Sequence, residues 1–314
     1  MTFIALVRSC RPRQWIKNLL VFAAPLFSFR FDSDIWLPAC GALVAFCMVS
    51  SAVYLLNDSL DIEADRQHHR KRYRPIAAGL VSVTMALAAS ALLAVSSLTL
   101  AGAITAPLAV VTLAYALVQV GYCLRLKREP LLDLCCIGSG FLLRAIAGGV
   151  AAGIALSPWF LLTVGLLAMF LAVEKRKAEL QIDLDRGVVT RQVLTRYSLP
   201  LLLRFESLLS TSAFISYSIW AAGPALDTRG ASSSWMLLSV PFVLIGIFRY
   251  QLISDPEEVS RRLFAPIEKT CEQPEQILLR DRGIQIILMS WLFTVAVVGF
   301  SNHAGLLPAG GLFG

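Results

Sequence analysis

Long apolar stretches constrain this chain more than any other feature of its sequence. A helix that crosses a membrane needs about 20 apolar residues, and stretches of this kind recur along the 314 residues. Only 16% of the residues are charged, whereas soluble domains typically carry about a quarter. Because backbone polar groups inside a bilayer must be satisfied internally, the sequence predicts an all-α fold, a polytopic membrane helical bundle.

We expect about nine transmembrane helices, each of roughly 17–25 residues, in a single integral membrane domain over residues 1–314. A charged helical extension follows the second and the sixth of these predicted spans. The spans cover residues 15–30, 35–57, 81–101, 105–124, 131–152, 158–174, 199–222, 234–252 and 284–303.

The basic residues indicate how the spans are oriented. All 28 Lys and Arg residues, apart from Arg30, Arg144, Arg204 and Arg229, fall in the N-terminal flank or in loops near 58–80, 125–130, 175–198 and 249–283. Cytoplasmic loops of membrane proteins carry such an excess of Lys and Arg. We therefore expect the N-terminus inside and the C-terminus outside. This distribution also explains the net charge of +7 without a nucleic-acid partner.

An acidic motif follows the second predicted span. Asp58, Asp61 and Asp65 are spaced i, i+3 and i+7, so on an α-helix they share one face, which Asn57 borders. Three carboxylates on one stripe repel one another, and a divalent cation removes that repulsion. Mg²⁺ prefers oxygen ligands and often binds through carboxylates together with substrate phosphates. The pattern favours a Mg²⁺–diphosphate site with all four residues as metal ligands and the three aspartates as catalytic residues.

A solvated acidic helix end is the commoner interpretation of such a cluster. Here, however, the motif directly follows an apolar span, at the membrane interface, where ionisable residues are costly and usually functional. The basic run after it brings cations that can bind phosphate, among them Lys71, Arg72 and Arg74. We expect His68 and His69 to be interfacial residues or phosphate donors rather than metal ligands.

Several motifs resemble those of one family, the UbiA superfamily of intramembrane prenyltransferases. The stretch Asn57-Asp58-x-x-Asp61-x-x-x-Asp65 matches its NDxxDxxxD signature. The resemblance covers nearly the whole chain and implies a multi-pass enzyme of the bacterial inner (plasma) membrane with its active site facing the cytoplasm. Further motifs that carry it are Arg11 to Asn18, Arg72 to Gly79, and Tyr122 to Lys127 together with Asp133.

Within the superfamily, the stretches Phe141 to Gly149 and Lys175 to Leu180 resemble the group of phosphoribosyltransferases. Aromatic prenyltransferases of the superfamily usually carry a second, DxxxD motif after the sixth span, whereas Lys175, Arg176 and Lys177 stand here. Cations bind phosphate directly, as a donor with an extra phosphate requires. The resemblance implies Mg²⁺-dependent transfer of 5-phosphoribosyl from 5-phosphoribosyl diphosphate (PRPP) to a polyprenyl phosphate, releasing diphosphate, for synthesis of a cell-wall or surface-glycan pentofuranose donor.

The expected substrate-binding residues combine these motifs. Arg144 lies inside the fifth span, where a cation is expensive, and a substrate role and an ion pair with Asp133 are equally open. Lys177 and His69 depart from the group, which usually has tyrosine and proline at those positions. The full set is Lys17, Asn18, Asn57, Lys71, Arg72, Arg74, Tyr122, Lys127, Arg144, Lys175 and Glu179.

Two alternatives remain open at the level of sequence. A polyprenyltransferase acting on an aromatic acceptor would share the fold and the metal site, and the i, i+4 pair Glu179 and Asp183 would suit it. A transporter is the rival from another class, but transporter sites usually lie near the bilayer midplane rather than at one rim. A homo-oligomer is compatible with either.

Overall fold

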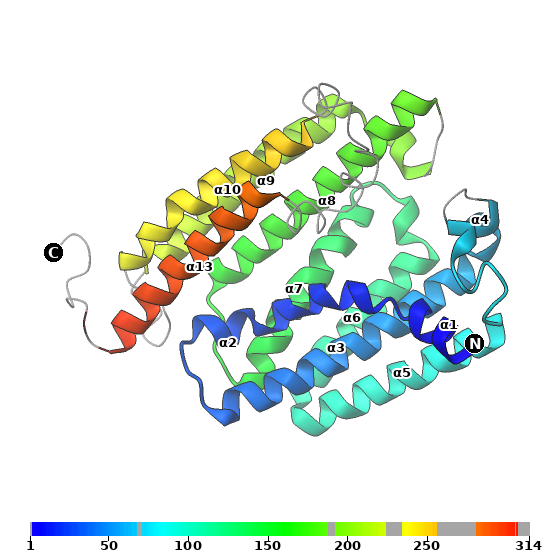
Figure 1. Cartoon of the computed structure of the whole chain (residues 1–314), viewed down its shortest axis with the longest axis horizontal. Helices are drawn as coiled ribbons and strands as arrows, with labels where there is room; N and C mark the ends of the chain where they lie inside the picture. Colours follow the sequence, from blue (N-terminus) through cyan, green and yellow to red (C-terminus); the bar gives the residue numbers. More distant parts are fainter. Residues whose placement is uncertain are drawn as a thin grey trace. The chain divides into compact units, whose positions relative to one another are not determined.

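The structure of the chain is a computed structural model that describes residues 2–67, 71–187, 192–223, 234–255, 281–304 and 306. Every regular element among these residues is a helix (Figure 1). The chain divides into two compact units, the first formed by Met1–Leu26 and Arg30–Leu156, the second by Phe27–Phe29 and Ser157–Gly314. The single domain that the sequence predicts stays a prediction.

Within the described residues, seven helices are long and apolar enough to cross a membrane. This confirms the all-helical, polytopic fold class, although the count of nine is not confirmed. The seven are α3 (Ser33–Leu60), α5 (Val83–Ile104), α6 (Ala106–Leu124), α7 (Leu132–Ala152), α8 (Pro158–Arg186), α10 (Val240–Ser254) with the 3₁₀ helix η5 (Ser234–Ser239) before it, and α13 (Arg282–His303).

The two remaining predicted spans differ for physical reasons. Residues 15–30 lie largely on a 3₁₀ helix, η1 (Pro12–Phe22), and a short helix, α2 (Ala23–Phe27), so this stretch contains no single α-helix of membrane-crossing length, and the first predicted span stays a prediction. Helix α9 (Leu199–Ala221) is long enough but less apolar, because it carries Arg204, Glu206 and several serines. The sixth predicted span continues as helix to Arg186, which confirms its charged extension.

Sequence signals set the ends of these helices. The side chains of four N-cap residues accept a hydrogen bond from the backbone N–H three residues further on, namely Ser82, Thr105, Ser198 and Asp281. Proline stands at the start of α6, α8, α9 and α10, where its missing N–H costs no helical hydrogen bond. Gly153 and Gly187, both with φ of 64°, follow α7 and α8 in the left-handed conformation that suits glycine.

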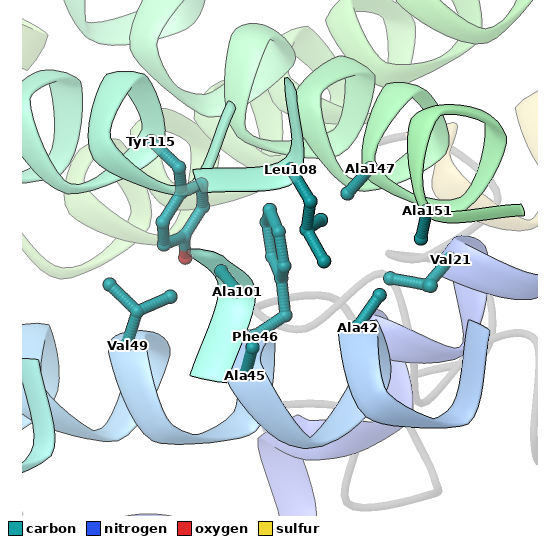
Figure 2. Packing of buried hydrophobic residues seen from close by; sticks show 10 residues of the cluster. All are labelled: Val21, Ala42, Ala45, Phe46, Val49, Ala101, Leu108, Tyr115, Ala147 and Ala151. Atoms are coloured by element: carbon teal, nitrogen blue, oxygen red, sulfur yellow. The ribbon is translucent and has the colours of Figure 1, made fainter. Parts of the chain in front are cut away.

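Helix α3 is the centre of the first unit and packs against α5, α6, α7 and η1. Figure 2 shows Phe46 of α3 pointing toward Leu108 and Tyr115 of α6, with alanines of α3, α5 and α7 around it. Small residues let membrane helices approach closely. Two α5 hydroxyls use this proximity, since Ser97 and Ser90 donate to α3 carbonyls over 2.7 Å each.

The second unit is built from α8 packed along α9, and α10 packed along α13. An aromatic cluster closes one end of it. The ring of Phe27 lies 5.2 Å from that of Trp220, 5.8 Å from that of Phe160 and 5.9 Å from that of Trp291, in edge-to-face contacts. Such contacts stabilise beyond the apolar area they bury, and Trp291 adds a hydrogen bond to the Tyr217 hydroxyl over 2.8 Å.

Helix α7 approaches the backbone of η1 closely at Gly148. A Cβ atom added at Gly148 would lie 1.7 Å from the backbone carbonyl oxygen of Val21, so no side chain fits between the two segments. Gly148 therefore determines how η1, and the chain leading into it, sit on the bundle.

We predict that Gly148→Ala lowers the free energy of unfolding by about 1–3 kcal/mol, because the added methyl group pushes a backbone carbonyl away. The measurement is the thermal unfolding midpoint of the purified protein in detergent. Gly102→Ala is the matched control in the same unit, because its Cβ would meet Ala109 at 3.9 Å, an ordinary contact. Equal midpoints for the two variants would contradict the close approach.

Candidate functional site

The acidic motif lies at the end of α3 but not on one continuous helix. Helix α3 ends at Leu60, Asp61 is its C-cap with φ −94° and ψ 11°, and α4 (Ile62–Gln67) begins at the next residue. Backbone hydrogen bonds from Asp61 to Asn57 (3.0 Å) and from Asp65 to Asp61 (2.8 Å) keep the chain nearly helical across the break. The single helix face expected from the spacing is thus only partly realised.

Arg74 joins two of the three carboxylates. Its Nη1 lies 3.1 Å from Asp58 Oδ1 and 2.6 Å from Asp65 Oδ2. Asp58 and Asp65 are 2% and 3% exposed, so an unpaired charge on either would be expensive. Arg74 follows the 3₁₀ helix η2 (Lys71–Tyr73), and this turn carries it back over the end of α3.

Arg11 is the residue of this site that sequence reasoning named in a motif but did not select. Its Nη2 donates to the same oxygen of Asp58 that Arg74 contacts, and its guanidinium lies 4.9 Å from the centre of the Tyr54 ring. The backbone of Arg11 has φ 53°, in the left-handed region, as it caps η1. A non-glycine residue held there is uncommon. The sequence feature that could have identified Arg11 is its position as the first residue of the Arg11 to Asn18 motif, just before the first apolar run.

The third carboxylate has its own cation. Lys127 Nζ lies 2.6 and 2.7 Å from the two oxygens of Asp61 and 3.4 Å from Asn57 Oδ1. Lys127 comes from the 3₁₀ helix η3 (Leu126–Arg128) between α6 and α7. Asn57 therefore borders Asp61, as the spacing predicts. The site balances three carboxylates with three cations drawn from three separate segments.

Electrostatics at this site follow from burial and pairing. The pKa of Asp65 is raised because burial disfavours its charged form, and Asp58 adds to this, while Arg74 and Lys71 lower it. Burial lowers the pKa of Arg11, but the charge of Asp58 and its hydrogen bond outweigh this and raise the pKa overall. Arg74 and Lys71 thus oppose the effect that burial has on the pKa of Asp65.

The other predicted substrate-binding residues differ in how close they lie to the acidic motif and in how exposed they are. Lys71 is near enough to Asp65 to lower its pKa, whereas Arg72 is exposed and donates to the hydroxyl of Tyr73 over 2.8 Å. Lys17 and Tyr122 are half-buried, and their substrate roles stay predictions. The departure noted at His69, like His68, lies outside the described residues.

Arg144 and Asn18 are joined to each other inside the first unit. Arg144 donates to Asn18 Oδ1 over 2.7 Å, to the Gly140 carbonyl over 2.7 Å and to the Tyr115 hydroxyl over 2.8 Å. All three acceptors are uncharged, so the hydrogen bonds described for Arg144 do not include the ion pair with Asp133 that was weighed from the sequence. The guanidinium instead ties η1 and α6 to α7, and its fork geometry suits this task better than a lysine would.

The basic stretch on α8 is largely engaged within the second unit. Arg176 is fully buried and pairs with Glu179. Lys177 is 2% exposed and lies 2.9 Å from Glu174 and 2.5 Å from Glu206 of α9. This buried network was missed from the sequence. The sequence did contain a signal for this network. Glu206 lies inside the apolar stretch 199–222, where a charged residue is as costly as Arg144 is in the fifth span. The roles predicted for Lys175 and Glu179 stay predictions.

The donor chemistry of the acidic motif can be tested against a divalent metal. Asn57, Asp58, Asp61 and Asp65 offer only oxygen ligands, the kind that Mg²⁺ prefers. Among the residues that the structure describes, no three acidic, His or Cys side chains converge into a complete metal cage. This arrangement suits a metal held by one or two carboxylates and by phosphate oxygens of a substrate, rather than a permanently bound structural ion.

Solved structures show where the fold recurs. The structure of a UbiA homologue from Archaeoglobus fulgidus bound to GPP and Mg²⁺ matches with a TM-score of 0.69 and 20% identity, covering 94% of this chain and 99% of that one. A digeranylgeranylglyceryl phosphate synthase matches with a TM-score of 0.63 and 17% identity, covering 95% and 98%. At these identities the likeness is one of fold.

Sequence relatives are considerably more similar. The decaprenyl-phosphate phosphoribosyltransferase of Mycolicibacterium smegmatis is 41% identical over 308 residues, covering 94% of this chain and 93% of the relative. The protein of the same name from Mycobacterium tuberculosis is 39% identical over 301 residues, covering 94% of each chain.

The family assignment rests on the length of the match as well as on these relatives. The pattern of the UbiA prenyltransferase family matches residues 19–265, which include the acidic motif, Arg74, Lys127 and the α8 stretch. With seven helices able to cross a membrane among the described residues, the chain is an integral membrane protein, and it belongs to the UbiA prenyltransferase family.

Proposed function

We propose that this protein transfers the 5-phosphoribosyl group of PRPP to a polyprenyl phosphate and releases diphosphate. The observation that carries the proposal is the full-length similarity, at 36–41% identity, to decaprenyl-phosphate phosphoribosyltransferases of three bacterial genera. The charge pattern of the site supports it, because two anionic reactants need cations close to the reacting carbon.

The reaction balances without a redox partner. The bond between ribose C1 and the diphosphate oxygen breaks, and the diphosphate leaves with the bonding electrons. A phosphate oxygen of the lipid forms the new bond to C1. A phosphate oxygen is already ionised near neutral pH, so the protein needs no strong general base and contributes mainly by positioning and by charge.

The acidic motif has a defined role in this proposal. Asp58, Asp61 and Asp65, with Asn57, would hold Mg²⁺ on the diphosphate of the donor. When bound, Mg²⁺ neutralises the charge that develops on the departing diphosphate. The protein's own contribution is to present these oxygens at fixed spacing around the break between α3 and α4, with two of them buried.

The cations around the motif have a second role. Arg11, Arg74 and Lys127 each contact a carboxylate of the motif. In the proposal these same cations contact phosphate oxygens once donor and metal are bound, because the metal then neutralises the carboxylates in their place. Arg74, which reaches two carboxylates, would orient the donor, and Lys127 would do so from the side of Asp61.

The proposal includes the membrane in which the protein lies and the side that its active site faces. The distribution of Lys and Arg supports a bacterial inner membrane protein with its N-terminus and acidic motif on the cytoplasmic side. PRPP is water-soluble and would enter from that side, whereas the polyprenyl tail would stay in the apolar bilayer. The pentofuranose donor formed would serve cell-wall or surface-glycan synthesis.

The experiment that tests the reaction uses the purified full chain with radiolabelled PRPP, polyprenyl phosphate and Mg²⁺. We expect label to enter the lipid phase together with release of diphosphate, and chelation by EDTA to stop both. A parallel reaction with polyprenyl diphosphate and an aromatic acid should release none. Diphosphate released in that second reaction alone would assign the aromatic prenyltransferase activity instead.

The metal assignment makes a separate prediction. Asp58→Asn and Asp61→Asn keep the side-chain shape but remove the charge, and each should lower kcat by at least about 100-fold, as expected when a group that stabilises transition-state charge is lost. Glu63→Gln is the matched control on α4, because Glu63 is 77% exposed and pairs only at the surface with Arg66. Near-normal turnover of Asp58→Asn, with an unchanged Mg²⁺ requirement, would refute the assignment.

The donor preference tests the α8 stretch. Because Arg176 and Lys177 are buried whereas Lys175 is half-buried, Lys175 is the member of the basic stretch that we expect to contact the donor. Lys175→Gln should raise the KM for PRPP about tenfold or more, the usual cost of a charge-assisted hydrogen bond, and leave the KM for polyprenyl phosphate unchanged. Arg125→Gln, at an exposed position, is the control. An unchanged KM for PRPP would make Lys175 a membrane anchor.

A further inference from the structure

The N-terminal helix α1 (Thr2–Ser9) is apolar on two opposite faces. One face packs on the protein, where Ala5 joins Leu55, Ile76, Val81 and Ala86 in a buried cluster. The other face carries Phe3, Ile4 and Val7, whose exposed fractions are 76%, 67% and 41%. Large apolar side chains gathered on one exposed face mark an interaction surface rather than a water-facing one.

The exposed apolar surface continues past α1. On η1, Trp15, Ile16 and Leu19 are 38%, 42% and 51% exposed. The charge at its edge is positive, since α1 contains no acidic residue and carries Arg8 in its last turn. Arg13, the next basic residue after Arg11, is exposed as well. An apolar face with a basic edge is the pattern of helices that lie in the plane of an anionic membrane surface.

The place of α1 along the bundle fits the same position. Helix α3 ends at Leu60, and α1 packs close to that end, in the cluster that includes Leu55 five residues earlier. Helices in the membrane interface bury their apolar face at the boundary between headgroups and acyl chains, which is where the end of a membrane-crossing helix is expected.

We propose that α1 lies in the interface of the cytoplasmic leaflet, with Phe3, Ile4 and Val7 among the acyl chains and with Arg8 and Arg13 bound to the phosphates of anionic phospholipids. The occupant of this surface is the lipid itself, because α1 packs on α3, a helix long and apolar enough to cross the membrane, and the basic edge is complementary to the charge of the lipid. This inference goes beyond the proposed reaction and does not depend on it.

The position of α1 affects the acidic site, because the chain leads from α1 directly to Arg11. The hydroxyl of Ser51 in α3 accepts a hydrogen bond from Trp15 Nε1 (3.1 Å), and its single hydrogen is shared between the Cys47 carbonyl oxygen of its own helix (2.7 Å) and the Cys10 carbonyl oxygen (3.2 Å). Arg11 lies between Cys10 and Trp15 in the chain and pairs with Asp58. In this proposal, α1 and Ser51 together hold Arg11 in its left-handed backbone conformation. They thereby keep the Arg11 guanidinium next to Asp58.

The first test replaces Phe3 with photoreactive benzoylphenylalanine in the full chain, reconstituted in nanodiscs of phosphatidylglycerol and phosphatidylethanolamine. We expect illumination to add the mass of one phospholipid to the chain. The same group at Glu63, which is 77% exposed on α4, is the control and should add none. A cross-linked dimer would make this face an interface between copies, and an unmodified chain would place it in water, so either result overturns the proposal.

The second test measures amide hydrogen exchange of residues 3–10. We expect slower exchange in phosphatidylglycerol discs than in phosphatidylcholine discs, and a loss of this protection of about fivefold for each arginine replaced in Arg8→Gln and Arg13→Gln. Arg30→Gln, at an exposed position paired with Asp32, is the control and should change nothing. Exchange that is equal in the two lipids would refute the anionic contact. Neither test uses turnover, so failure here is distinguishable from failure of the proposed reaction.

Discussion

Charge balance at the end of α3 is the interaction on which the site depends. Two carboxylates are nearly fully buried where an apolar helix ends, and the third lies at the helix break. Arg11, Arg74 and Lys127 reach them from three segments that are far apart in sequence. Because a buried charge without its partner is strongly destabilising, these pairs bind the N-terminal flank, the turn after η2 and the loop at η3 to one place, and they fix the spacing of the oxygens between them.

The same balance explains how such a site can serve a polyanionic donor. In the proposed function, Mg²⁺ offsets part of the negative charge of the diphosphate, and Arg11, Arg74 and Lys127, released from the carboxylates, offset more of it. A site built from carboxylates alone would repel the donor, and a site built from cations alone would not hold the metal. Both kinds of residue are needed at the same point.

Sequence reasoning predicted the helical membrane class, six of the seven apolar spans to within three residues at either end and the position of the acidic motif. Hydropathy reports composition, so it could not show that Pro12–Phe22 forms a 3₁₀ helix in close contact with Gly148, nor that Glu206 of α9 is buried against Lys177. Helical spacing implied one continuous face, but the break at Asp61 turns this residue toward Lys127. Arg11 and Glu206 were missed because their importance lies in contacts across long stretches of sequence, which spacing within a motif does not contain.

Arg144 has a consequence that extends over the whole first unit. Its guanidinium is held by an amide oxygen, a backbone carbonyl and a phenol, so none of these acceptors cancels its charge. A buried charge of this kind is costly unless its donors are satisfied. Asn18, Gly140 and Tyr115 must therefore stay together around it, so that η1, α6 and α7 are held as one group and η1, which follows Arg11 in the chain, is anchored in the bundle by Arg144.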